Sequence, residues 1–290
     1  MKRLRRTMLF MPGNNPGMLQ SADILGADSI ILDLEDAVSL TEKDAARILV
    51  REAIKSLHYK GVEVVVRINP LDTEYAMDDI ENIAKVKPDT ILVPKVTEDA
   101  IVKVDKELTR IEKEQGFEEG SIRLFGLVET AYGVENVYNI IKSSNRVEGI
   151  LLGGEDLTSD LGVKRTKQGD EILYARNKVS MVCRALRVDS IDTPFTDTND
   201  FEGLRKDTEK AKNLGFTGKA SINPRQIDTI HSVFAPAAAE IKHAQRVMDT
   251  MEEAKREGKG VFSLDGKMVD APVINRAKTT LELAKILGLI

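Results

Sequence analysis

Short runs of apolar residues alternate along this chain with segments whose apolar residues recur every three to four positions. The short runs are rich in Val, Ile and Leu, and each one predicts a strand. The predicted strands span residues 7–12, 29–36, 62–70, 90–96, 122–130, 148–156, 190–197 and 219–224. The segments between them have the periodicity of amphipathic helices and span residues 45–57, 76–86, 100–114, 133–144, 172–186 and 203–215.

This alternation predicts a parallel sheet, because consecutive parallel strands need a crossover connection. Most of the runs are apolar throughout, as expected for strands covered by helices. We therefore expect an α/β fold, a (β/α)8 TIM barrel over residues 1–245 that forms the catalytic domain. Residues 246–290 are expected to form a C-terminal helical extension of the same domain. A doubly wound open sheet is the alternative, but PGNNPG after the first strand lacks the GxGxxG spacing of its dinucleotide site.

Composition narrows the functional classes. The net charge of -5 over 290 residues lacks the basic excess of a nucleic-acid-binding protein. No apolar run approaches the roughly 18 residues of a membrane span. We therefore expect a cytoplasmic protein that binds neither nucleic acid nor membrane. The opening KRLRR is the one dense basic cluster, and we interpret it as solvated terminal charge in preference to a device that steers an acidic partner.

The predicted strands end in polar residues, and in a parallel barrel the active site lies at these carboxyl ends. The polar residues at the strand ends are Asp33, Glu35, Asp36, Arg67, Asn69, Lys95, Glu129, Glu155, Asp156, Asp192, Asp197 and Asn223. Carboxylates that follow buried strands are costly unless they are paired or bind metal. Many acids around a few cations therefore predict a site for a hard divalent metal ion and an anionic ligand.

Three of these residues are the strongest candidates for binding. Glu129 and Asp156 end neighbouring strands, and Mg2+ is typically held by one or two carboxylates while water and substrate fill its other positions. The alternative is that both only pair with basic neighbours. Arg67 offers a planar fork for a substrate carboxylate. An internal ion pair with the acids at the end of the second strand is an equal alternative for Arg67.

Several segments then become familiar when they are taken together. They are LFMPGNNPGML, DSIILDLEDAV, VVVRINP, ILVPKV, LVETAYG, ILLGGEDLTSDLG, KASINPRQI and DGKMVDAPV, in this order. Together they resemble the citrate lyase beta and malyl-CoA lyase superfamily, whose members have a pyruvate-kinase-like barrel. The resemblance covers essentially the whole chain. It departs at PGNNPGM, where an acidic or small residue often follows the glycine in the wider family.

The resemblance implies a magnesium-dependent carbon-carbon lyase, with Mn2+ as a possible substitute for Mg2+. The expected reaction cleaves a citryl thioester on an acyl carrier protein to oxaloacetate and an acetyl thioester, as in citrate fermentation. Glu129 and Asp156 resemble the metal ligands, and Arg67 and Glu129 the residues that contact the substrate. The implied partners are the acyl carrier protein (gamma subunit), an alpha subunit transferase and further copies of this chain in a trimer or hexamer.

The resemblance also suggests how protons move. In such a cleavage a base takes the hydroxyl proton, and the carbon-carbon bond opens to a ketone and a thioester enolate. Glu35 and Asp36 resemble an acidic pair beside the reacting carbons. Asp270 matches an aspartate that reaches a neighbouring subunit's site, so we expect Asp270 to be the base, with Glu35 and Asp36 orienting or moving protons. The alternatives are a lyase acting on malyl-CoA or citramalyl-CoA and, more remotely, a noncatalytic binding barrel.

Overall fold

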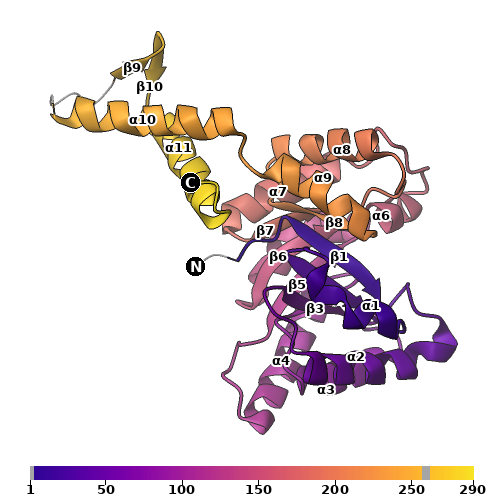
Figure 1. The fold of residues 1–290 in the computed structure, drawn as a ribbon. Coiled ribbons are helices and arrows are strands. Elements are labelled where there is room, and N and C mark those ends of the chain that lie inside the picture. Colours follow the sequence, from indigo (N-terminus) through magenta and orange to yellow (C-terminus); the bar gives the residue numbers. More distant parts are fainter. Residues whose placement is uncertain (1–2, 257–261) are drawn as a thin grey trace. The chain divides into compact units, whose positions relative to one another are not determined.

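The first part of the molecule is a closed barrel of eight parallel strands. The computed structural model describes residues 3–256 and 262–290, and the chain divides into two compact units, residues 1–231 and 232–290. The barrel strands follow the order of the sequence and confirm the predicted TIM barrel (Figure 1). They are β1 (Thr7–Pro12), β2 (Ser29–Asp33), β3 (Glu63–Arg67), β4 (Thr90–Val93), β5 (Arg123–Val128), β6 (Val147–Leu152), β7 (Asp189–Asp192) and β8 (Gly218–Ser221).

Helices connect these strands, and each predicted amphipathic segment is helical. The first unit contains α1 (Pro16–Gln20), α2 (Lys43–Leu57), α3 (Ala76–Ala84), α4 (Glu98–Gln115), α5 (Ala131–Lys142), α6 (Gly154–Asp160), α7 (Leu173–Leu186), α8 (Phe201–Asn213) and the start of α9 (Ile227–Phe234), with short 3-10 turns η1 (Ala22–Ile24), η2 (Leu40–Glu42) and η3 (Pro224–Gln226). Thr97 and Thr130 cap α4 and α5, because their side chains accept the N–H groups of Ala100 and Gly133. The short helix α6 was not predicted, since it follows β6 with only Gly153 between them.

The strands place alternate side chains inside the barrel and against the surrounding helices. The interior core consists of Met8, Ile31, Val65, Leu92, Phe125, Leu127, Leu151, Ile191 and Ala220. On four strands, the residue two positions after an interior core residue also points inward, and its side chain is polar. These residues are Asp33, Arg67, Glu129 and Thr193. The alternation therefore delivers polar groups to the carboxyl end of the barrel, directly above an apolar floor.

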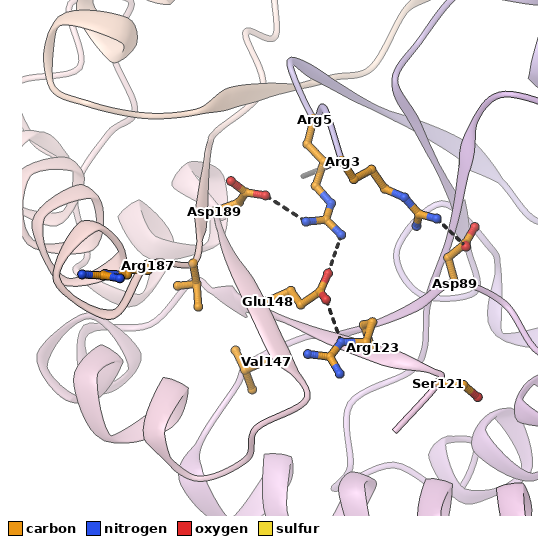
Figure 2. A pocket seen from close by; sticks show the side chains of 10 residues that line it. Arg3, Arg5, Asp89, Ser121, Arg123, Val147, Glu148, Arg187 and Asp189 are labelled. Atoms are coloured by element: carbon orange, nitrogen blue, oxygen red, sulfur yellow. Dashed lines mark hydrogen bonds and ion pairs between the residues drawn. The ribbon is translucent and has the colours of Figure 1, made fainter. Parts of the chain in front are cut away.

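The basic residues before β1 lie at the opposite, amino end of the barrel. Arg5 is buried, and its Nε and Nη2 each donate to Glu63 at 2.8 Å. Its Nη1 donates to Asp189 at 2.8 Å (Figure 2). Arg6 pairs with Asp28 at 2.7 Å. The prediction that the opening basic cluster is solvated charge is therefore wrong for these two arginines, which are part of the folded barrel.

The second unit is a small helical assembly with its own apolar cluster. It contains the last three residues of α9, then α10 (Ala238–Arg256), the antiparallel hairpin β9 (Phe262–Leu264) and β10 (Lys267–Val269), and α11 (Ala271–Ile286). Residues 257–261, between α10 and β9, fall outside the described residues. The division between the units comes before residue 245, the predicted end of the barrel domain.

Within residues 3–256 and 262–290, no helix has the length and apolar character that crossing a membrane requires.

Candidate active site at the carboxyl end of the barrel

A cavity of about 380 Å3 opens at the carboxyl ends of the strands. Its lining residues are Phe10, Asp33, Asp36, Ala37, Arg67, Leu127, Glu129, Leu151, Gly153, Gly154, Glu155, Asp156, Thr193, Pro194 and Ile222. A larger cavity of about 550 Å3 lies at the amino end, where Arg5 pairs with Glu148 and Asp189, and Arg3 with Asp89 (Figure 2). Active sites of parallel barrels lie at the carboxyl end, so the smaller cavity is the candidate.

Glu129 directly follows β5 and is a buried carboxylate on the cavity wall. Its Oε1 accepts the backbone N–H of Lys95 at 2.7 Å. Burial, and then the charges of Glu35 and Asp156, raise the pKa of Glu129 to about 9, against the opposing effect of that hydrogen bond. Gly153 is required beside it, because a Cβ at this position would lie 2.7 Å from the Cβ of Glu129.

Asp156 lies in the first turn of α6, half-buried on the same cavity. The start of α6 is fixed by the N–H of Gly154, which donates to Oγ1 of Thr193 at 2.9 Å. The neighbouring Glu155 is exposed and lies 3.6 Å from Arg165. Thr193 was not among the predicted site residues, although its place two residues after an inward apolar residue of β7 was a usable signal.

Arg67 ends β3 and is tied to the acids at the end of β2. Its Nε and Nη2 donate to the two oxygens of Asp33 at 2.7 and 2.6 Å. Its Nη1 lies 2.8 Å from Glu35 and 3.5 Å from Asp36. The structure thus contains the internal ion pair that was one of the two alternatives for Arg67. Contact with a substrate carboxylate stays a prediction, and Nη1 is the nitrogen that Asp33 leaves available for it.

Glu35 is a second buried carboxyl group with a displaced pKa. Burial raises this pKa to about 7, with Arg67 opposing the rise and the charges of Asp36 and Asp33 adding to it. The contact of Glu35 Oε2 with Arg67 is an ion pair without hydrogen-bond geometry. Asp36 is exposed and lines the cavity. A carboxyl group with a pKa near neutrality can exchange protons at physiological pH.

A buried lysine holds the loop that carries this acidic pair. Nζ of Lys43, on α2, donates to the carbonyl oxygens of Leu34 and Glu35 at 2.7 and 2.6 Å. Its side chain is buried, and burial lowers its pKa. Lys43 was not among the predicted site residues, because a lysine at the start of an amphipathic helix is usually solvated.

Three of the polar residues predicted at strand ends do not line the cavity, and their side chains form hydrogen bonds within the barrel scaffold. Asp192 faces the helices, where it accepts from Arg176 and Lys219. It directly follows the inward Ile191, so the two-residue period of the strand turns it outward. Asn69 donates its side-chain amide to Asp79 at 2.7 Å, and Asn223 caps the 3-10 turn η3.

Asp270 belongs to the second unit, where it caps a helix. Its Oδ1 accepts the N–H of Val273 at 3.2 Å in the first turn of α11. The side chain is half-buried. Its role in the site of a neighbouring copy therefore stays a prediction.

The cavity offers oxygen donors suited to a hard divalent cation. Over the ranges 3–256 and 262–290, no three His, Cys, Asp or Glu side chains are grouped to hold a metal ion by themselves. A cation that keeps water and substrate oxygens needs only one or two protein carboxylates, and Glu129 and Asp156 line one cavity. A bound cation would offset the repulsion that raises the pKa of Glu129. The donor set fits such an ion.

Comparison with known proteins agrees with this geometry. The family model described as HpcH/HpaI aldolase/citrate lyase matches residues 6–224. Citrate lyase subunit beta of Leuconostoc mesenteroides subsp. cremoris is 47% identical over 98% of this chain and 94% of its own. A (3S)-malyl-CoA thioesterase of Cereibacter sphaeroides (strain ATCC 17029 / ATH 2.4.9) is 34% identical over 98% of this chain and 95% of its own.

A solved structure extends the likeness to the fold. CitE from Mycobacterium tuberculosis, in complex with magnesium, acetoacetate and coenzyme A, is 28% identical with a TM-score of 0.82, and the match covers 98% of this chain and 100% of that one. The family match, the relatives and the barrel with its acidic mouth lead to one conclusion. The chain belongs to the HpcH/HpaI aldolase/citrate lyase family of carbon-carbon lyases.

Proposed function

We propose that this lyase requires Mg2+ and cleaves a citryl thioester carried by an acyl carrier protein, giving oxaloacetate and an acetyl thioester. The observation that carries the proposal is the pair Glu129 and Asp156 on one cavity, in a chain 47% identical to a citrate lyase subunit beta. The Mycobacterium tuberculosis relative that binds magnesium and acetoacetate, an oxo acid, supports the same chemistry.

In this proposal Glu129 and Asp156 hold the metal ion, and Arg67 orients the substrate. Mg2+ would supply a Lewis acid for the oxygen that becomes the ketone. Asp33 fixes two nitrogens of Arg67, so the guanidinium can stay in place while a substrate carboxylate replaces Glu35 as the partner of Nη1. The apolar floor of the cavity excludes water from the reacting carbons.

Proton transfer needs a base for the tertiary hydroxyl group and a donor for the enolate carbon. We assign the base to Asp270 of a neighbouring copy, and proton exchange to Glu35 and Asp36. The pKa of Glu35, near 7, supports its part in this assignment. The hydroxyl proton leaves, the carbon-carbon bond breaks to form the ketone, and the thioester enolate takes one proton, so the step balances without a further reactant.

The name of the 47% identical relative, a subunit, supports a multi-subunit enzyme. We propose that the partners are the acyl carrier protein, an alpha subunit transferase and further copies of this chain in a trimer or hexamer. The cytoplasmic location stays a prediction.

The test is oxaloacetate release from citryl-carrier in the presence of Mg2+, measured by coupling to malate dehydrogenase. We expect release that EDTA abolishes and that added Mg2+ restores. The matched variant is Glu129→Gln, which keeps the size of the side chain and removes the charge. Release that survives chelation, or that survives this substitution, would contradict the proposal.

A second candidate substrate is a CoA thioester. It is favoured by the likeness to a (3S)-malyl-CoA thioesterase and to a structure containing coenzyme A. Parallel assays with citryl-carrier, citryl-CoA and malyl-CoA separate the candidates. A kcat/KM for citryl-carrier at least tenfold above that for either CoA thioester would support the carrier, and the reverse order would support the second candidate.

A further inference from the structure

Five non-glycine residues in the described part of the chain have a positive φ, a conformation that L-residues avoid. They are His58, Lys87, Lys95, Arg187 and Asp265. Four of them have an ordinary structural reason. His58 and Arg187 are the C-caps of α2 and α7. Lys87 follows α3 and donates its N–H to the last residue of that helix, and Asp265 lies in the turn of the β9–β10 hairpin. Lys95, with φ 44°, is different, because it follows strand β4 and ends no helix.

The backbone of Lys95 serves the active site. Its N–H donates to Oε1 of Glu129 at 2.7 Å, so the turn at Lys95 helps to fix a proposed metal ligand. Any residue that accepts this conformation would provide that N–H, and glycine would do so with the least strain. The hydrogen bond therefore explains the backbone conformation at Lys95. It does not explain why the residue is a lysine, so the side chain has a separate role.

The ammonium group of Lys95 is an available cation beside the mouth of the barrel. The side chain is exposed and lines a cavity of about 360 Å3, together with Pro70 and Pro94 from the ends of β3 and β4. Within the described residues, no hydrogen bond or ion pair involves its Nζ. Its charge nonetheless reaches the acidic loop, because it opposes the rise in the pKa of Glu35 that burial causes.

Among the described residues that line the candidate cavity, Arg67 is the only one with a cationic side chain. A citryl thioester has two free carboxylates, and it enters a cavity whose walls are themselves rich in carboxylates. Two nitrogens of Arg67 donate to Asp33, so only Nη1 is left for the substrate. Nη1 alone can contact one carboxylate, and not in a bidentate arrangement. The proposed Mg2+ would offer one further positive charge. The chain itself offers another in the exposed ammonium of Lys95, whose backbone nitrogen lies 2.7 Å from Oε1 of Glu129.

We propose that Lys95 binds a carboxylate of the substrate's oxo-acid portion, and that its left-handed backbone is kept so that one residue fixes Glu129 and presents this cation. The inference rests on the proposed function, because it names a specificity residue for that reaction. Binding by Lys95 predicts a preference for substrates with two free carboxylates over those with one.

The test uses Lys95→Asn and Lys95→Gly, because both residues tolerate a positive φ and keep the N–H that Glu129 accepts. We expect the KM for citryl-carrier and the Kd for oxaloacetate, measured by calorimetry with Mg2+ present, to rise about ten- to a hundredfold, the usual effect of losing a charge-assisted hydrogen bond. The affinity for Mg2+ alone should change by less than about threefold, since the backbone contact remains. Lys95→Arg, which keeps the charge, should recover part of the loss.

Lys87→Asn is the matched control. Lys87 also has a positive φ, at 54°, and precedes the same strand β4, but its ammonium lies 5.1 Å from the ring centre of Phe117. The control makes the same substitution in the same backbone conformation at the other end of the strand. It should leave KM and Kd unchanged.

The outcomes are distinct. If wild type is active but Lys95→Asn has an unchanged KM and Kd, this inference is overturned and the proposed function stands. An equal loss in Lys87→Asn, or a loss of affinity for Mg2+ alone in Lys95→Asn, also overturns it, because the effect would then be structural. If wild type neither cleaves citryl-carrier nor binds oxaloacetate, the proposed function fails and the inference fails with it.

Discussion

Buried glutamates at the two ends of the barrel have pKa values shifted in opposite directions. Glu63 at the amino end and Glu129 at the carboxyl end are both almost completely buried. Burial raises the pKa of Glu63, but hydrogen bonds and charge from Arg5 outweigh it and lower the pKa to about 2. The pKa of Glu129 is instead raised to about 9 by burial and by neighbouring acids. The same side chain, equally buried, is stabilised as an anion at one end only.

The difference lies in the partners of each carboxylate. Glu63 accepts two hydrogen bonds from Arg5 and one each from Ser29 and Thr90. Arg5 also pairs with Glu148 and Asp189, so the amino end is a closed network (Figure 2). Glu129 has the N–H of Lys95 and faces a cavity. Paired charges stabilise the scaffold, whereas the unbalanced charges at the carboxyl end favour the binding of a cation.

The largest expected effect is on activity, at the carboxyl end. Glu129→Gln should lower kcat/KM for oxaloacetate release by about 10^3-fold or more, which is about 4 kcal/mol of transition-state stabilisation. The free energy of unfolding of the metal-free protein should change by less than about 1 kcal/mol, because Gln resembles the protonated carboxyl group favoured at pH 7. Steady-state kinetics and urea unfolding in EDTA check both parts. A large loss of stability would show that Glu129 belongs to the scaffold.

Glu63→Gln should do the opposite at the amino end. The substitution leaves Arg5 buried with one acidic partner fewer, so we expect a loss of about 3–5 kcal/mol in the free energy of unfolding. The kcat of the folded fraction should stay within about twofold of wild type, since the cavity lies at the other end of the barrel. Urea unfolding and active-site titration separate the two quantities. A specific loss of kcat with unchanged stability would break the comparison.

The two ends should also respond to pH in opposite directions. The pKa of Glu63 is about 2 in the folded protein against an ordinary 4.5, so its contribution is present above pH 4.5 and is lost as the pH falls toward 2. The pKa of Glu35 is raised from 4.5 to about 7, so its contribution is present below pH 4.5 and is lost as the pH rises to 7. Each change is on the order of 3 kcal/mol.

Urea unfolding in EDTA between pH 3 and pH 8, in steps of about half a unit, measures the free energy of unfolding against pH. The curve has an acidic limb below pH 4.5 and a second limb above it. Glu63→Gln should flatten the acidic limb. Glu35→Gln should reduce the slope between pH 4.5 and pH 7 and leave the part due to Glu129, whose pKa is about 9. The comparison between the ends fails if either variant flattens the limb assigned to the other.

Periodicity was enough to predict the barrel, but not which strand-end residues face its cavity. The β-then-α alternation predicts the eight strands because helices and strands differ in apolar period. Side-chain direction needs the register of each strand end: Glu129 follows the inward Leu127 by two residues, whereas Asp192 follows Ile191 by one and faces the helices. Counting in twos from the apolar core would have excluded Asp192 and selected Thr193.

Other features depend on contacts between residues far apart in the sequence. Arg5 appeared as terminal charge because its acidic partners Glu63, Glu148 and Asp189 lie more than 50 positions away. The burial of Lys43 depends on carbonyl groups of the loop after β2. Local pattern contains no information on such pairings. The polar residues at the strand ends could therefore be predicted, but the contacts that support them could not.

The smallest expected effect concerns Arg187, which lines the cavity at the amino end. It is the C-cap of α7 with φ 61°, and among the described residues its guanidinium forms no hydrogen bond or ion pair. Arg187→Gly should raise the free energy of unfolding by about 0.5–1 kcal/mol, because glycine adopts this conformation without strain. Activity should be unchanged, since this end supports the fold. Urea unfolding and kinetics at saturating substrate check both. A fall in kcat would show that the amino end influences the reaction, and a fall in stability would show that the Arg187 side chain contributes to the scaffold more than its backbone strain costs.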